Sequence, residues 1–341
     1  MSGPKRRKAK YKATLIYADE PQLLLLTAQS VNVIAVAIPD ADETKSMFLA
    51  ATATRKDWQS YMDGAVDLRY LFTYPKSRLA YTFDLNKMSS GEVMLAPFTD
   101  ALPEEYLPES RMFSSHHTED LPVEPTAVGA ETLYVDGEWD MPEFGAFYQR
   151  YSDVYSFIAA TRNWANAQVD AQSRQRIQNT FRTKPFEGGF SYVHFFQELV
   201  EKVLRTQRLG LERISYASPG SVVISGEDEL FSDMNEIIPN FLDNRRDLSK
   251  LYSSLYKYLS ENHYLKMSGT AFATAPAGED YIFLQAEQLT EMMGSLNFET
   301  VKALTGGNAL VTAKIILAFY RRLEEASAYF AQGRVNFTDL Q

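Results

Sequence analysis

Leu23-Leu-Leu-Leu-Thr-Ala28 and Val31-Asn-Val-Ile-Ala-Val-Ala-Ile38 are two apolar runs near the start of the chain, separated only by Gln29-Ser30. Short runs rich in Leu, Val and Ile and bounded by polar residues are typical of β-strands. Because the runs are apolar almost throughout, they predict strands that are buried on both faces or that wrap into a barrel.

The same module extends to residue 98 and contains a helical pair. Thr54 is a predicted N-cap with Asp57 in the first turn of its helix, and Asp67 is a predicted cap of a second short helix. An antiparallel sheet needs no helical crossovers, so we expect a small α+β module over residues 11–98. Its remaining strands are expected at residues 11–18, 47–53, 79–83 and 92–95.

A basic cluster precedes this module, and residues 1–10 are interpreted as a basic tail. Without the six basic residues of the cluster, the rest of the chain would carry a charge of −16. One interpretation is a solvated segment ahead of the first strand. The alternatives are contact with nucleic acid, with anionic lipid or with an import receptor. The candidate nucleic-acid contacts are Lys5, Arg6, Arg7, Lys8 and Lys10, with Lys12 completing the cluster.

Residues 99–145 are predicted to be an acidic, proline-rich linker. Between Asp100 and Glu143 there are twelve acidic residues and a single basic one, Arg111. Prolines interrupt regular structure and like charges oppose a packed core.

Residues 146–341 are predicted to form a mainly helical domain. Two short strands at 211–216 and 221–224, joined through Ser218-Pro219-Gly220, predict a β-hairpin within it. Pro239 is expected to break a helix or to lie in its first turn. The predicted fold class is therefore α+β, a small antiparallel β-rich N-terminal module followed by a larger, mainly helical C-terminal domain with a short β-hairpin.

Composition excludes several classes of protein. The 341 residues include 34 basic and 44 acidic side chains, a net charge of −10, and no cysteine. The missing cysteines exclude disulfides, thiolate metal sites and a cysteine nucleophile. Apolar runs of about 18 residues, the length of a membrane helix, are also missing. We therefore expect a soluble, cytoplasmic protein with no membrane partner.

Motifs for chemistry are weak, and no catalytic residue, cofactor or metal ligand is assigned. His116 and His117 are adjacent, an awkward spacing for a shared metal. Glu229, Asp233 and Glu236 have helical spacing, which suits either a carboxylate site of a hydrolase or a solvated helix face. Glycine-rich turns before helix starts, including Gly306-Gly307, suit an anion or a simple cap. The candidate anion or ligand contacts are Gly188, Gly189, Ser191, Ser218 and Gly220.

A family resemblance is carried by three stretches, of which two are given first. They are Asp57-Trp-Gln-Ser-Tyr-Met-Asp-Gly-Ala-Val-Asp-Leu-Arg-Tyr-Leu-Phe72 and Pro185-Phe-Glu-Gly-Gly-Phe-Ser191. With Ile214-Ser-Tyr-Ala-Ser-Pro-Gly220, they resemble an uncharacterised bacterial domain family of unknown function. The resemblance implies a prokaryotic source and a mobile or defence-associated locus, and it implies no catalytic residues.

The leading hypothesis from the sequence is a non-enzymatic, protein-binding or accessory component of a bacterial complex. Its protein partner and its oligomeric state are not specified by any motif. Two alternatives stay open: a nucleic-acid-associated factor that uses the basic N-terminus, and a hydrolase with an unrecognised carboxylate site.

Overall fold

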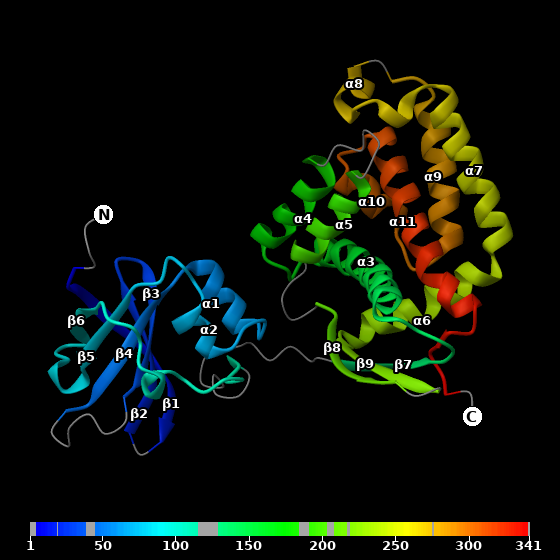
Figure 1. Cartoon of the computed structure of the whole chain (residues 1–341). Helices are drawn as coiled ribbons and strands as arrows, with labels where there is room; N and C mark the ends of the chain where they lie inside the picture. The colour runs from blue at the N-terminus through cyan, green and yellow to red at the C-terminus, as the bar shows by residue number, and fades with distance from the viewer. Residues whose placement is uncertain are drawn as a thin grey trace. The chain divides into compact units, whose positions relative to one another are not determined.

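The computed structural model describes residues 5–18, 20–38, 45–114, 129–183, 191–202, 208–216, 219–274 and 276–339. The chain divides into two compact units, Met1–Pro125 and Thr126–Gln341 (Figure 1). The first unit is an antiparallel β module and the second is mainly helical, which confirms the predicted α+β class. Within the described ranges, no helix has both the length and the apolar character needed to cross a membrane.

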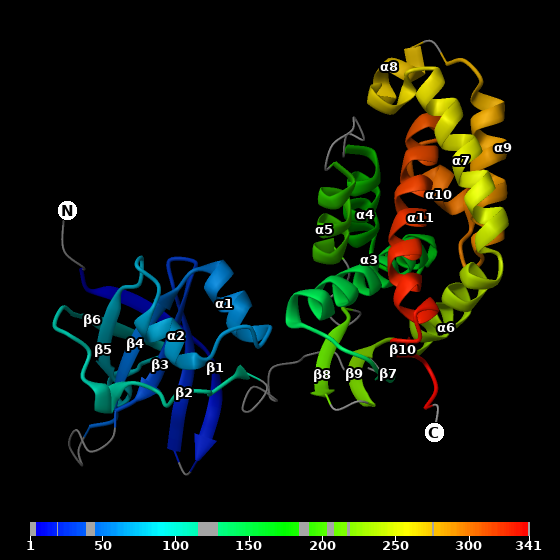
Figure 2. The same cartoon turned by 45° about the vertical axis from the view of Figure 1, so that its right-hand side comes forward.

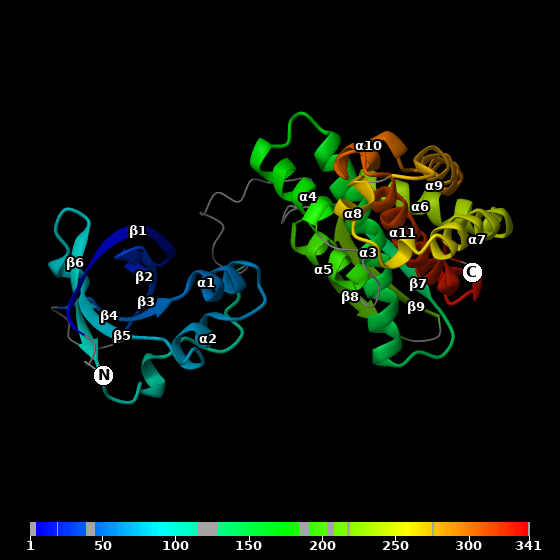
Figure 3. The same cartoon turned by 90° about the horizontal axis from the view of Figure 1, so that it is seen from above.

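A closed six-stranded antiparallel barrel forms the first unit, and Figure 3 shows its strands around a central axis. Each strand pairs with the next one in the sequence, and β6 closes the barrel by pairing with β1. The strands are β1 (Arg7–Ala18), β2 (Glu20–Ala28), β3 (Val31–Ala37), β4 (Met47–Ala53), β5 (Ala80–Asp84) and β6 (Glu92–Phe98). Helices α1 (Arg55–Met62) and α2 (Leu68–Thr73) connect β4 to β5.

The leucine run on β2 is buried on both faces, as predicted. Leu24 and Leu26 belong to the cluster inside the barrel, together with residues of the other strands. Leu23 and Leu25 point outward and pack with the buried residues of α1 and α2. Alternate side chains of a strand point to opposite faces, so two separate cores require an apolar residue at every position.

Both predicted helix caps are present. The Thr54 hydroxyl oxygen accepts a hydrogen bond from the Asp57 N–H at 3.1 Å. The Asp67 carboxylate accepts from the Tyr70 N–H and also from the Arg111 N–H, each at 2.9 Å. Asp67 therefore caps α2 and also holds a later segment of the chain against it.

Residues 7–10, expected in a loose tail, belong to β1. Arg7 pairs with Leu95 of β6 and Lys10 with Glu92, and Ala9 is 1% exposed inside the barrel. Ala9 is the one small residue between Lys8 and Lys10. When β6 is present as a partner strand, the burial of Ala9 on the inner face is enough for this segment to form a strand. The expectation of a tail through residue 10 is therefore wrong for these four residues.

Much of the predicted linker packs onto one unit or the other. Leu102, Tyr106 and Leu107 contact the core beneath α1 and α2, and Arg69 forms an ion pair with Glu104. Residues 129–135 form a strand, and the first long helix begins at Met141. The boundary between the two compact units falls at Pro125, inside the predicted linker. Its central residues, 115–128, lie outside the described part of the chain.

Helices of the second unit surround one apolar core, in which α11 packs against α3, α9 and α6 (Figure 2). Their order in the chain is α3 (Met141–Ala165), α4 (Ala171–Thr183), α5 (Ser191–Lys202), α6 (Asp228–Asp243), α7 (Arg245–Glu261), α8 (Gly269–Thr274), α9 (Glu279–Met293), α10 (Phe298–Leu304) and α11 (Ala309–Ala331).

A small antiparallel sheet lies at one end of this unit, in the order β10-β7-β9-β8 (Figure 1). The predicted hairpin is its β8–β9 part, and β7 and β10 extend it. Distant strands of low apolar content give no local signal for this pairing, so the larger sheet was not predicted. The strands are β7 (Gly129–Val135), β8 (Gly210–Ser215), β9 (Gly220–Gly226) and β10 (Val335–Asn336).

Pro239 lies inside α6 and does not end it. A proline in a helix interior lacks the N–H for one helical hydrogen bond and crowds the preceding turn. Its neighbours Ile237, Ile238 and Phe241 are fully buried in the core of the unit. Burial of these side chains on the helix outweighs the local cost, so the expected break is absent.

Candidate functional site

Strand β1 carries a row of exposed cations on the outside of the barrel. Ala9 points into the barrel, whereas Lys8, Lys10 and Lys12 are exposed, as are Lys5 and Arg6 just before the strand. The register skips Lys12 between two paired positions, which marks a bulge. Three of the five nucleic-acid candidates, Arg7, Lys8 and Lys10, therefore lie on β1, with Arg7 half-buried, and the other two precede it.

Among the described residues, Lys8 is the one cation of this row that forms an ion pair with a carboxylate. The Lys8 ammonium lies 2.5 Å from the Glu92 carboxylate on β6, and this hydrogen bond lowers the pKa of Glu92 below its usual value. Lys10 and Lys12 form no ion pair with any carboxylate in the described part of the chain. The charge of Lys10 also lowers the pKa of Glu92, so this one carboxylate partly offsets both lysines.

Charge is divided unevenly along the chain. Residues 5–98 contain thirteen basic and ten acidic side chains, a formal charge of +3, whereas the rest of the chain carries −13. Residues 99–125, which complete the first compact unit, add seven acidic side chains and one basic one, so the unit as a whole carries −3.

Exposed apolar side chains gather at β8 in the second unit. Leu211, Ile214 and Tyr216 are 48%, 42% and 55% exposed. The Tyr216 hydroxyl donates a hydrogen bond to the Gly137 carbonyl at 3.0 Å and accepts one from the backbone N–H of Trp139. Tyr216 therefore lies against the loop before α3, and Met141, the first residue of α3, is 74% exposed. These four side chains are called the β8 patch below: Leu211, Ile214, Tyr216 and Met141.

A bulge brings two residues of the β8 patch to one face of the sheet. Leu211 pairs with Ile224 and Ile214 pairs with Val222, and the register skips one residue of β8 between these pairs. Cross-strand neighbours share a face, and both β9 partners are buried toward the helices. Leu211 and Ile214 therefore continue the helix-covered face of the sheet onto a strand that has β9 as its one strand partner among the described residues.

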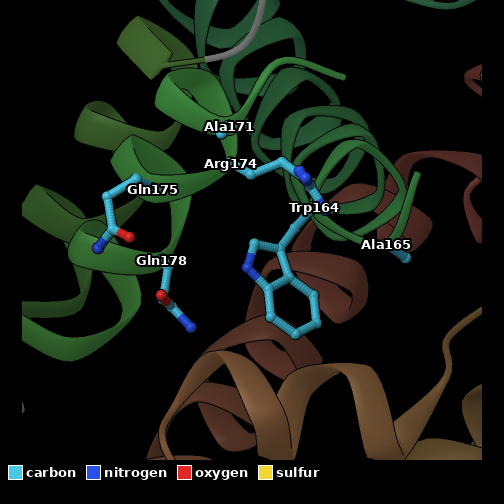
Figure 4. A pocket seen from close by; sticks show the side chains of 6 residues that line it. All are labelled: Trp164, Ala165, Ala171, Arg174, Gln175 and Gln178. Carbon is cyan, nitrogen blue, oxygen red and sulfur yellow. The ribbon is translucent and has the colours of Figure 1, made fainter. Parts of the chain in front are cut away.

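A hollow of about 450 Å³ lies between the end of α3 and α4 (Figure 4). The indole of Trp164 and the side chains of Arg174, Gln175 and Gln178 surround it. The Arg174 Nε is buried without a hydrogen-bond partner, whereas the Gln175 amide donates to Asn179 at 2.9 Å. A cationic and amide lining of this kind suits a small anion, but the hollow is open to solvent.

A second hollow, of about 460 Å³, is lined by aromatic side chains of the first unit. Tyr70 and Tyr74 are stacked with their ring centres 5.1 Å apart, and Pro75 and Lys76 complete one side. Tyr74 is 74% exposed, so this hollow is a shallow aromatic surface.

The predicted anion contacts are not brought together by the described structure. Gly188, Gly189 and Ser218 lie outside the described residues. Ser191 is the first residue of α5, and Gly220 opens β9 opposite Val135.

Gly306 and Gly307 act as a helix cap. Their φ angles are 70° and 74°, and their N–H groups donate to the carbonyls of Ala303 and Lys302 at the end of α10. Both amides are used within the chain, which supports the capping interpretation over anion binding.

The expected carboxylate pair is part of an ion-pair network. Glu229 and Asp233 lie on one face of α6, as their spacing predicts, and both accept hydrogen bonds from Arg162 of α3, at 2.9 and 2.7 Å. Burial raises the pKa of Asp233 although Arg162 opposes the shift. The hydrolase hypothesis gains no support from this pair.

The described residues contain no group of three or more His, Asp or Glu side chains that could hold a metal ion. His116 and His117 lie outside them. His194 on α5 contacts Gln197, and His263 has a left-handed backbone at the end of α7.

Sequence reasoning missed a buried charge pair between α3 and α11. The side chains of Asp153 and Arg322 are 4% and 1% exposed, and their charged groups are 2.9 Å apart. Burial raises the pKa of Asp153 to about 6, and the charge of Arg322 opposes this rise. The available signal was an acid among apolar residues in Tyr151–Ile158.

Comparison of the chain with protein-family models, with curated proteins and with solved structures finds no match. The resemblance to a bacterial domain family therefore stays a hypothesis.

Proposed function

We propose that this chain is a non-enzymatic binding protein, an accessory component that joins a protein partner to a bacterial complex. The observation that carries the proposal is the β8 patch, in which four large apolar side chains are exposed around one strand. Isolated exposed apolar residues are ordinary, but a group of them marks an interaction surface.

The side chains in and beside the β8 patch indicate what kind of partner surface would fit it. Glu212 and Arg213 lie between Leu211 and Ile214 in the sequence, and both are exposed. Neither forms an ion pair within the described chain. Apolar anchors beside uncompensated charges are typical of a protein interface with a polar rim. The partner surface should therefore have an apolar centre with one acidic and one basic group beside it.

The proposed setting is the bacterial cytoplasm, and it rests on weaker observations. A chain without cysteine suits a reducing compartment. The resemblance to a bacterial domain family supports the further proposal of a defence-associated locus.

The test compares two charge substitutions at exposed apolar positions. Ile214→Asp changes the β8 patch, and Leu284→Asp changes a residue of α9 that is equally exposed, at 49% against 42%. Each tagged full-length protein is purified from the bacterial host together with what it retains, and the retained proteins are quantified against the wild type.

We expect a defined partner to be retained by the wild type and by Leu284→Asp but to fall at least ten-fold with Ile214→Asp. Circular dichroism melting of both variants checks that the fold is intact. Equal retention by both variants, or retention of no defined partner by any of them, would overturn the proposal.

A further inference from the structure

We propose that the hollow between the end of α3 and α4 binds a small anionic heterocycle, of the size and chemistry of a nucleoside monophosphate. The hollow has a volume of about 450 Å³ and is lined by residues outside the β8 patch, so either proposal can fail alone. The inference rests on three features of the lining: a cation without a partner, an aromatic wall and a free amide (Figure 4).

Arg174 is the cation without a partner. Its guanidinium forms no ion pair and no hydrogen bond within the described chain, and its Nε is buried. A buried donor that has lost its hydrogen bonds to water and gained no acceptor is costly, so it calls for a physical explanation. None of the described residues that line the hollow is acidic. A phosphate or carboxylate group of a ligand would supply the missing acceptor, and a guanidinium can bind either group through two N–H donors.

The charges of α4 favour an anion at this place. The helix contains three arginines and no acidic residue, although the compact unit to which it belongs has a net charge of −7. Asp170 precedes the helix and accepts a hydrogen bond from the backbone N–H of Ser173 at 2.9 Å, so the first turn is already capped. The attraction for an anion therefore comes from arginine side chains, and it does not depend on a free helix N-terminus.

The indole of Trp164 gives the hollow an aromatic wall. Trp164 is half-buried and packs against the apolar core of the unit, so its ring is held in place without a ligand. Ala165 and Ala171 add only small side chains to the lining. Flat rings pair favourably with an indole, beyond the area that they bury. An inorganic anion has no ring to place against this wall, so Trp164 favours a ligand in which a ring carries the anionic group.

The free amide favours a heterocycle. Figure 4 shows the Gln178 amide and the indole nitrogen of Trp164 on opposite sides of the hollow, with Arg174 reaching from α4 toward the indole. Gln178 and the indole N–H form no hydrogen bond in the part of the chain that the structure describes, whereas the Gln175 amide donates to Asn179. An amide both donates and accepts hydrogen bonds, so Gln178 suits a ring whose edge has both kinds of group, as nucleobases have.

The experiment titrates the full-length chain with nucleoside monophosphates of each common base, with benzoate and with inorganic phosphate, by calorimetry and by tryptophan fluorescence. Two charge variants carry the test, Arg174→Gln and Arg176→Gln. Arg176 is an exposed residue of the same helix that does not line the hollow, so both variants lower the charge of α4 equally. Gln178→Ala has its matched control in Gln172→Ala, at an exposed glutamine of the same helix. Circular dichroism melting checks the fold of each variant.

We expect one or more of the nucleotides to bind with a dissociation constant of about 0.1 mM, because a hollow open to solvent buries only part of its ligand. Arg174→Gln should weaken this binding about ten-fold, and Gln178→Ala should weaken it about five-fold, since each removes a hydrogen-bonding group. The two control variants should bind as the wild type does. Trp164→Phe should abolish the change in fluorescence, because stacking on the indole is its source.

Three results would overturn the inference. The first is binding of benzoate or inorganic phosphate as tight as that of the nucleotides, because the heterocycle would then contribute nothing. The second is equal weakening by the Arg174 and Arg176 variants, which would place the anion elsewhere on the helix. The third is no binding of any nucleotide at concentrations up to about 5 mM.

Discussion

Arg322 on α11 and Asp153 on α3 form a buried ion pair, with Nε and Oδ2 2.9 Å apart in the core of the second unit. Neither atom has an aligned hydrogen-bond geometry, so the contact is mainly one of charge. Arg322 also pairs with Glu325 at 2.9 Å, and Glu325 pairs with Arg150. The Asp153–Arg322 pair therefore joins two central helices through charges that have little access to water.

Asp153→Ala should destabilise the second unit by about 3–5 kcal/mol, because it leaves the charge of Arg322 buried and less compensated. Adding Arg322→Met should recover most of this loss, since an apolar pair of similar volume needs no compensation. Asp247→Ala, which breaks the exposed pair with Lys250, should have a much smaller effect. Urea unfolding at pH 7 measures the free energy of unfolding of all three variants, and an Asp153→Ala variant as stable as the wild type would contradict the prediction.

Glu143 and Arg334 should make stability depend on pH. Arg334 binds the Glu143 carboxylate and lies over the Trp139 ring, 4.0 Å from its centre. The hydrogen bonds from Arg334 lower the pKa of Glu143 below 4.5. The resulting stabilisation is complete above the pKa of the unfolded chain and is lost as the pH falls through the lower pKa of the folded protein.

Glu143→Gln should therefore be less stable than the wild type at pH 7, and this difference should shrink at about pH 3. Chemical unfolding at both values measures the change. Glu212→Gln, at an exposed glutamate without an ion pair in the described chain, serves as the control. A difference that stays constant with pH would show that the ion pair does not contribute.

Gly278 should tolerate a side chain less well than Gly333 does, although both have positive φ angles, of 68° and 70°. A Cβ at Gly278 would lie 1.9 Å from the Tyr258 hydroxyl oxygen, whereas nothing lies within 4 Å of a Cβ at Gly333. Each alanine variant should lose about 1–2 kcal/mol from backbone strain. Gly278→Ala should lose more in thermal melting, because Tyr258 must move. Equal losses would show that Tyr258 moves freely.

The two compact units should fold separately, because each has its own apolar core. Residues 1–125 and 126–341, expressed as separate proteins, should each show a cooperative thermal transition. The melting temperature of each fragment should lie close to one transition of the full chain. A fragment without a cooperative transition would show that the boundary is misplaced.

Part of the candidate surface on β1 was predictable and part was not. The basic residues were evident, but a run rich in Lys and Arg gives no local reason for a strand. Only the pairing of β1 with β6 places Ala9 inside and its neighbours outside. The β8 patch had no signal at all, since exposure of Ile214 depends on which helices cover the sheet.

The sequence by itself determined the α+β class, the apolar strands of the barrel and the caps at Thr54 and Asp67, because periodicity and capping act over a few residues. Only the tertiary structure decided that β1 closes the barrel and that β7 and β10 extend the hairpin. It also decided that Pro239 stays within a helix. The Asp153–Arg322 pair likewise joins residues far apart in the chain. These features depend on burial and pairing between segments that are distant in the sequence. Local patterns such as periodicity and capping contain no information on those contacts.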